Sequence, residues 1–236
     1  MQKELHKLLQ EYTMLRSFLP TLPVWRLNPG RTAQPVTARP LDLQSLLGPD
    51  AWNRLPIAVQ RRFAMDCPHS SYHGHIDLQL SMLGRCFALC AKLLGAPLSG
   101  ERAHNVPTAV QVYHDANGGM VWERSFNSAS GAHQVRSTKQ SGPLGSVIER
   151  TDGGLSMELN VFEEDGALVF QSRKFLLCLG RYSLRVPALL TPGQCRVEHR
   201  DLGGGLFRFS LDMVHPLWGH TFRQSGVFVD PHWSAP

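Results

Sequence analysis

The sequence predicts an α+β fold that is mainly antiparallel β, a curved sheet or barrel of about ten strands with one inserted helix and N-terminal helices. Strand-like runs follow one another almost without interruption from residue 72 to residue 229. Many alternate apolar and polar residues, and glycine-rich turns separate several of them. Sequential strands joined by short turns form an antiparallel meander, and such a sheet removes its exposed edges by closing into a barrel.

Composition sets further limits. A chain of 236 residues with 42% hydrophobic and 18% charged residues can bury a sizeable core in one large β-rich domain. The net charge of +5 is carried by scattered single cations, which favours at most a mild affinity for anionic surfaces and argues against a nucleic-acid partner. The five cysteines are odd in number and irregularly spaced, which predicts free thiols rather than a disulfide framework.

The first forty residues differ from the rest. Leu5, Leu8, Tyr12, Leu15 and Leu19 form an amphipathic helical stripe, and frequent prolines follow up to Pro40. The stripe indicates either a helix docked on its own domain or a helix that binds a partner protein or a second copy through residues 1–19.

Charged residues interrupt the N-terminal apolar stripe, so no signal peptide is expected. No stretch of the sequence is long enough to span a membrane, so the expected location is cytoplasmic. We therefore predict a helix and tether at 1–40, one β-rich domain at 41–231 and a tail at 232–236.

The domain is predicted to begin with helices. Asp50–Phe63 has a helical pattern in which Pro56 can occupy a first turn. Tyr72–Leu80 is expected to be a strand, and Ser81 can cap a helix over Met82–Leu94. Leu83, Phe87, Cys90 and Leu94 form one apolar stripe of that helix, and Cys86, Leu89 and Leu93 widen it. So wide a stripe predicts that the helix is largely covered by the rest of the fold.

After Pro107 the apolar period becomes two, beginning with Val110 and Val112. The further strands are expected at Met120–Phe126, Gln134–Lys139, Ser146–Thr151, Leu155–Val161, Leu168–Cys178, Arg196–Arg200, Leu206–Val214 and Thr221–Val229. Gly203–Gly205 joins two of these strands and is interpreted as a turn rather than a phosphate-binding loop.

Several motifs come in an order that resembles a known family. They include LLGPDAWNRLPIAVQRRF at 46–63, WERSF at 122–126, PALLTP at 187–192 and HPLWG at 215–219. Together they are similar to the bacterial domain of unknown function 4166, over roughly residues 41–231. The resemblance implies a domain found alone or fused to saccharopine-dehydrogenase-like NAD(P)-binding domains, with no established catalytic residues to carry over. Phe63 stands where the resemblance leads us to expect a histidine.

One arginine lies between aromatic residues on a predicted strand. Period-two geometry places Trp122, Arg124 and Phe126 on one face, and a buried guanidinium needs a carboxylate partner. The functional interpretation is an arginine that binds an anion inside a pocket; the structural ones are a closed Arg–Glu pair or an arginine on the solvent face. The candidate ligand-binding residues are Trp122, Arg124, Phe126, Arg136, Glu149 and Glu198.

A second group shares a face of the first strand. His73, His75 and Asp77 could ligate a metal ion, but the opposite face, with Ile76 and Leu78, looks like the core side, so solvent exposure is the simpler interpretation. No phosphate loop or dinucleotide fingerprint is present, and no cofactor or metal is predicted.

The leading hypothesis is therefore a non-enzymatic domain that binds a lipid-like or amphipathic small molecule in a barrel cavity, with its polar end near Arg124. Two alternatives remain open. One is an enzyme, or an accessory domain that acts with an NAD(P)-dependent oxidoreductase. The other is a protein-interaction module that uses the N-terminal helix.

Overall fold

The structure of the chain is a computed structural model, which describes residues 40–67, 69–93, 102–128, 131–179 and 182–233. The amphipathic helix predicted at the N-terminus and the tether after it lie outside these residues. The predicted domain boundaries stay a prediction.

Helices flank the strands of the described region. They are α2 (Leu43–Leu47), α3 (Pro49–Arg54), α4 (Ile57–Phe63) and α5 (Met82–Leu93), with short 3-10 turns η1 (Pro143–Gly145) and η2 (Ala188–Leu190). The helical pattern predicted over Asp50–Phe63 is divided at Leu55, whose extended backbone ends α3, and Pro56 forms the N-cap of α4. None of the described helices is both long and apolar enough to cross a membrane.

The strands follow the expected series. They are β1 (Ser70–Leu80), β2 (Ala103–His114), β3 (Met120–Ser128), β4 (Gly131–Ser141), β5 (Val147–Thr151), β6 (Leu155–Glu164), β7 (Ala167–Leu179), β8 (Tyr182–Val186), β9 (Gln194–Gly203), β10 (Leu206–His215) and β11 (Gly219–Val229). The sequence did not predict β8, which is short and pairs only with the last residues of β7. The turn expected at Gly203–Gly205 is present between β9 and β10.

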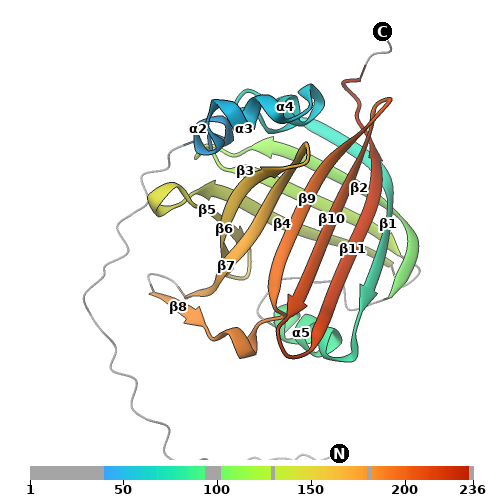
Figure 1. Cartoon of the computed structure of the whole chain (residues 1–236). Helices are drawn as coiled ribbons and strands as arrows, with labels where there is room; N and C mark the ends of the chain where they lie inside the picture. Colours follow the sequence, from blue (N-terminus) through green and yellow to red (C-terminus); the bar gives the residue numbers. More distant parts are fainter. Residues whose placement is uncertain (1–39, 68, 94–101, 129–130, 180–181, 234–236) are drawn as a thin grey trace, which may run out of the picture. The chain divides into compact units, whose positions relative to one another are not determined.

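The sheet closes on itself. Its strand order is β6-β5-β4-β3-β2-β1-β11-β10-β9-β7-β8, every pair described is antiparallel, and an additional pairing of β6 with β7 completes a ring of ten strands (Figure 1). The eleventh strand, β8, lies outside the ring as an extension of β7. The predicted antiparallel barrel with one inserted helix is confirmed.

The helices α2, α3 and α4 cover one end of the barrel (Figure 1). Asp42 caps α2 by accepting a hydrogen bond from the backbone N–H of Ser45 at 3.0 Å. Trp52, Val59 and Phe63 are buried, and the Phe63 ring stacks on Trp122 of β3 at 5.6 Å. This end of the interior is therefore closed by apolar packing.

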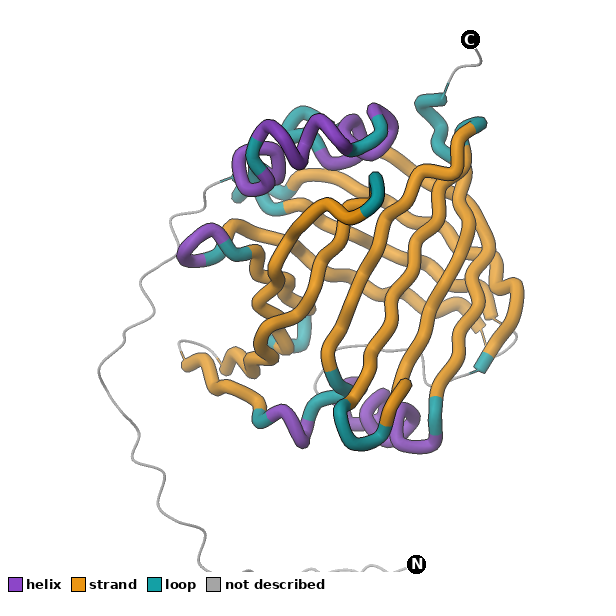
Figure 2. The backbone as a smooth tube through the Cα atoms, viewed as in Figure 1, coloured by secondary structure: helices purple, strands orange, loops and turns teal. Residues whose placement is uncertain are grey.

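The helix α5 lies at the other end of the barrel, beside the turn between β10 and β11 (Figure 2). Our prediction that it is largely covered is wrong. Its small residues Gly84, Ala88 and Ala91 are buried, whereas Met82 and Leu89 are 73% and 62% exposed. A side chain at position 84 would overlap the carbonyl of Thr221, so the close approach of α5 to β11 requires glycine and decides which face is buried.

Candidate binding site inside the barrel

The arginine singled out in the sequence lies inside the barrel. β3 alternates its side chains between the two faces of the wall, so Trp122, Arg124 and Phe126 all point inward. Trp122 and Phe126 are buried, and the Arg124 side chain is 13% exposed. The guanidinium lies 6.0 Å from the ring of Phe209 on β10, across the interior.

Arg124 belongs to a group of buried polar residues that we call the inner charge cluster: Arg124, Ser137, Lys139 and Glu149. Glu149 Oε1 on β5 accepts hydrogen bonds from Ser137 at 2.7 Å and from Lys139 Nζ at 3.1 Å, and lies 3.8 Å from Arg124 Nη2. Arg124 Nη2 donates to Ser137 Oγ at 2.9 Å. Of the two glutamates proposed as partners, the structure brings Glu149 to Arg124.

Sequence reasoning missed Lys139, although a signal for it exists. Val135, Ser137 and Lys139 alternate along β4, and a lysine on the same strand face as a core valine must be buried. Its ammonium lies 5.2 Å from the Trp122 ring and 5.4 Å from the Phe170 ring, so two aromatic faces as well as Glu149 stabilise the charge.

Burial and charge act on the ionisable groups of the cluster in opposite directions. Loss of solvent lowers the pKa of Arg124 and that of Lys139 below their usual values, although Glu149 opposes the effect. Burial also acts to raise the pKa of Glu149, but the two cations and the Ser137 hydrogen bond outweigh it, and the pKa is lowered. Burial raises the pKa of the nearby Cys195 thiol to about 12, so it is neutral. The cluster therefore sets two basic side chains, Arg124 and Lys139, against the one carboxylate of Glu149.

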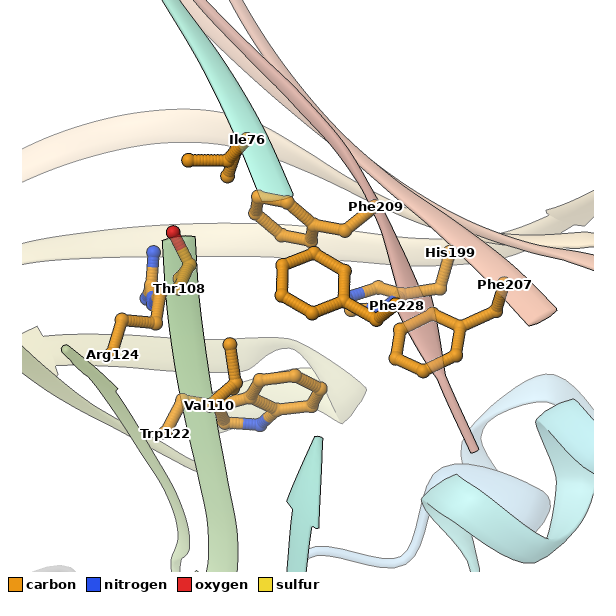
Figure 3. A pocket seen from close by; sticks show the side chains of 9 residues that line it. All are labelled: Ile76, Thr108, Val110, Trp122, Arg124, His199, Phe207, Phe209 and Phe228. Atoms are coloured by element: carbon orange, nitrogen blue, oxygen red, sulfur yellow. The ribbon is translucent and has the colours of Figure 1, made fainter. Parts of the chain in front are cut away.

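A small cavity lies beside Arg124. The side chains that surround it are those of Ile76, Thr108, Val110, Trp122, Arg124, His199, Phe207, Phe209 and Phe228 (Figure 3). The volume open to the centre of a water-sized sphere is about 10 Å³, which corresponds to about one water molecule. The strand pattern led us to expect a cavity large enough for a lipid-like molecule. Instead, the rings of Trp122, Phe207, Phe209 and Phe228 leave only this small space beside Arg124.

Three side chains around this cavity have a buried nitrogen atom without a hydrogen-bond partner among the described residues. They are Trp122 Nε1, Arg124 Nε and His199 Nδ1. The His199 ring lies 4.8 Å from Phe63 and 5.0 Å from Trp122, and burial lowers its pKa well below 6.5, so the imidazole is neutral. The indole and guanidinium nitrogens are obligate donors. The surface that lines the cavity is apolar, so an acceptor could reach these donors only after lining side chains move.

A second buried arginine lies toward the end closed by the helices. Arg62 of α4 stands over the ring of Phe207 at 3.6 Å, and its Nη2 lies 3.4 Å from Asp230 Oδ2. Its Nε and Nη1 have no hydrogen-bond partner within the described residues. The sequence gives little signal for it, because Arg61 and Arg62 follow each other in a helix where charged residues usually face solvent.

Two of the candidate residues lie away from this site. Arg136 is exposed on the outer face of β4, in register with Glu123 of β3. Glu198 of β9 accepts hydrogen bonds from Arg200 at 2.8 Å and Arg196 at 3.4 Å, and the buried His199 beside it faces the interior. The period-two rule explains both placements, since each is one residue away in sequence from a side chain that points inward.

The outer face of β1 carries His73, His75 and Asp77, all of them exposed. Asp77 accepts a hydrogen bond from the backbone of Asn105 and lies 3.6 Å from His104, whereas Glu149 points to the interior. No group of three or more His, Cys, Asp or Glu residues arranged for a metal ion occurs in the described ranges. The solvent-facing interpretation of these histidines agrees with their exposure.

A cysteine and a histidine lie in contact outside the barrel interior. Cys67 Sγ lies 3.3 Å from His114 Nε2, beside an open hollow that Tyr113 and Glu123 also line. Burial raises the pKa of the Cys67 thiol, and Asp66 adds to the effect. The thiol is therefore protonated at neutral pH, which does not favour a nucleophile.

The ten-stranded ring with its packed, charged interior defines the class of the protein, a closed antiparallel β-barrel domain. The chain belongs to the family described as Domain of unknown function (DUF4166), whose model matches residues 55–228. The bacterial origin and the fusion to NAD(P)-binding domains that the resemblance implied stay predictions. No curated protein matches the chain.

Among solved structures, the chain is similar to a siderocalin, Ex-FABP, which is described as functioning through dual ligand specificities. The identity is 8%, the match covers 71% of this chain and 76% of the siderocalin, and the TM-score is 0.26. A likeness this distant carries no argument about the ligand.

Proposed function

We propose that this domain is a non-enzymatic binding protein that takes up a small amphipathic molecule in the barrel interior, with its acidic end at Arg124. One observation carries the proposal. Trp122 and Arg124 line one cavity, each has a buried donor without an acceptor among the described residues, and the adjoining cluster sets two basic side chains against one carboxylate.

The energetics favour an anionic end group. A buried donor without a partner costs about 1–3 kcal/mol, and a carboxylate oxygen at Arg124 Nε would remove that cost. The same carboxylate would balance the second positive charge of the cluster, which Glu149 cannot neutralise alone. An alcohol of the same length would supply an acceptor but no charge, so the site should prefer the acid.

The size of the cavity limits the ligand. A volume of about 10 Å³ admits no alkyl chain, so binding requires the rings that line the cavity, Phe207, Phe209 and Phe228, to change rotamer. These rings come from β10 and β11, on the wall opposite Arg124. The apolar part of the ligand would replace their mutual contacts, among them the stacking of Phe207 on Phe228 at 5.6 Å.

A calorimetric titration with decanoate and with 1-decanol tests the proposal. We expect wild-type protein to bind decanoate more tightly, and Arg124→Gln to weaken that binding by about tenfold or more, as expected for a hydrogen bond to a charged group. Arg136→Gln is the matched control, because it removes an arginine from the outer face of the adjacent strand. Native mass spectrometry of the purified protein provides an independent check for a bound acid.

Two results would count against the proposal. The first is the absence of binding for both compounds together with a purified protein whose mass is that of the bare chain. The second is equal affinity of the Arg124→Gln and Arg136→Gln variants for decanoate, which would remove Arg124 from the site.

A further inference from the structure

The helix α5 presents its large apolar side chains to solvent. Gly84, Ala88 and Ala91 face the barrel, so the opposite side of the helix carries Met82 and Leu89, which are 73% and 62% exposed. Cys86 and Cys90 lie on the same outward side and are also exposed. An ordinary surface helix buries its large apolar residues, whereas α5 leaves several of them exposed.

The exposed apolar surface continues onto the turn between β10 and β11. Leu217 is 71% exposed and Trp218 is 39% exposed, and the Trp218 ring lies 5.8 Å from the Phe87 ring of α5. His215 stacks under Trp218 at 4.0 Å and holds the indole at the surface. We call this surface the apolar end; it comprises Met82, Leu83, Cys86, Leu89, Cys90, Leu217 and Trp218.

Cations border the apolar end. Arg85 and Lys92 are exposed on α5, three and ten residues after Met82, which places both on one flank of the outward stripe. The helix MLGRCFALCAKL contains no acidic residue. Arg102 follows α5 in the described chain and, together with Arg223, lines a hollow beside it. Arg223 Nε lies 3.4 Å from Asp212 Oδ1, which offsets one of these positive charges. The charge around the apolar surface is therefore mostly positive.

We infer that the apolar end docks on an anionic lipid surface. A helix that lies in a membrane interface combines leucine and aromatic side chains on one face with Arg and Lys at its border, and α5 with Trp218 has this composition. Trp218 suits the headgroup region, where an indole can keep its N–H hydrated while its ring is buried. The cations would meet the negative charge of the lipid phosphates, which gives the attraction a range that apolar contact alone lacks.

Co-sedimentation with vesicles tests the inference, using phosphatidylcholine vesicles with and without phosphatidylglycerol. We expect the full chain to bind only the vesicles that contain phosphatidylglycerol. The double variant Met82→Ser, Leu89→Ser should lower the partition constant for binding to these vesicles by about tenfold or more, because two large apolar side chains are no longer buried in lipid. Arg85→Gln and Lys92→Gln should each lower it by about fivefold.

The matched control is Ile57→Ser, which removes an apolar side chain that is 75% exposed on α4, at the other end of the barrel. Its binding should equal that of wild type. All these positions are exposed, so the fold should persist, and circular dichroism checks this.

Two outcomes overturn the inference. Equal vesicle binding of the serine double variant and Ile57→Ser would show that net charge alone attracts the protein. Absence of vesicle binding, combined with a wild-type dimer that the serine double variant loses in sedimentation analysis, would assign the apolar end to contact between two copies of the chain.

Discussion

Glu149 supplies the negative charge of the inner charge cluster, and its removal is the most demanding test of that cluster. Glu149→Gln keeps the size of the side chain but leaves Lys139 and Arg124 buried without a counter-charge. Breaking a buried ion pair in this way costs about 3–5 kcal/mol. With an m-value of about 2 kcal/mol per molar urea, the midpoint of unfolding should fall by about 2 M.

The comparison with Lys139→Gln makes the test specific. That variant leaves one guanidinium opposite one carboxylate, Arg124 and Glu149, so the interior becomes neutral. It loses one charge-assisted hydrogen bond, which contributes about 1.5–3 kcal/mol, and it also removes the cost of a surplus buried cation. The urea midpoint should therefore fall much less than for Glu149→Gln. If both variants lower it equally, charge balance does not govern the stability of this interior.

The pH dependence of the stability of wild type and of Glu149→Gln gives a second measurement. The pKa of Glu149 in the folded protein lies below its usual 4.5, since the cations and Ser137 outweigh burial. A carboxylate of this kind contributes stability that is fully present above the unfolded pKa and is lost as the pH falls through the folded pKa. The stability difference between wild type and Glu149→Gln should therefore shrink below about pH 4.5. A difference that persists unchanged there would contradict the assignment.

Three further variants probe the packing. Gly84→Val should place a side chain against the Thr221 carbonyl and displace α5, which lowers the thermal midpoint, whereas a wild-type midpoint would show that the contact is loose. Phe63→Ala should cost about 3–5 kcal/mol in urea unfolding, because the ring is fully buried against Trp122; a cost near zero would contradict this packing. His199→Leu should remove a pH dependence: wild-type stability falls as the pH drops below 6.5, where the unfolded histidine binds a proton that the folded one does not. Equal slopes for the two proteins in that range would refute the buried neutral state of His199.

Much of the barrel could be predicted from alternation and turns, because both are local. Trp122 and Arg124 share a strand face by backbone geometry alone, and the buried aromatic residues on that face identify it as the inner one. The neighbouring Arg136 shows the limit of this approach. The strand that contains Arg136 was predicted. Whether Arg136 points into the barrel or outward depends on the register of that strand, and a register error of one residue exchanges the two faces.

Other features depend on contacts that are distant in sequence. The apolar pattern of α5 predicted the helix but favoured the wrong face, since the close approach of Gly84 to Thr221 brings together residues far apart in the chain. Arg62 could not be placed inside for the same reason, because its partner Asp230 lies near the other end of the domain. The strand β8 was missed because it is short and gains its only partner from β7.

The pairing between β7 and β9 covers only part of the two strands, and we call the place where it stops the seam. The two strands pair only from Ala167 to Gln171 on β7, and β7 then turns to β8. Beyond that point the amide of Cys195 is held by the hydroxyl of Ser172 at 2.8 Å instead of by a strand backbone. Rotation of one serine side chain would release it, so amide exchange at Cys195 should be faster than at its neighbours on the β10 side. Cys195 is fully buried and borders the inner charge cluster, so an opening of this seam would admit solvent and protons toward the buried charges while the rest of the ring stays paired.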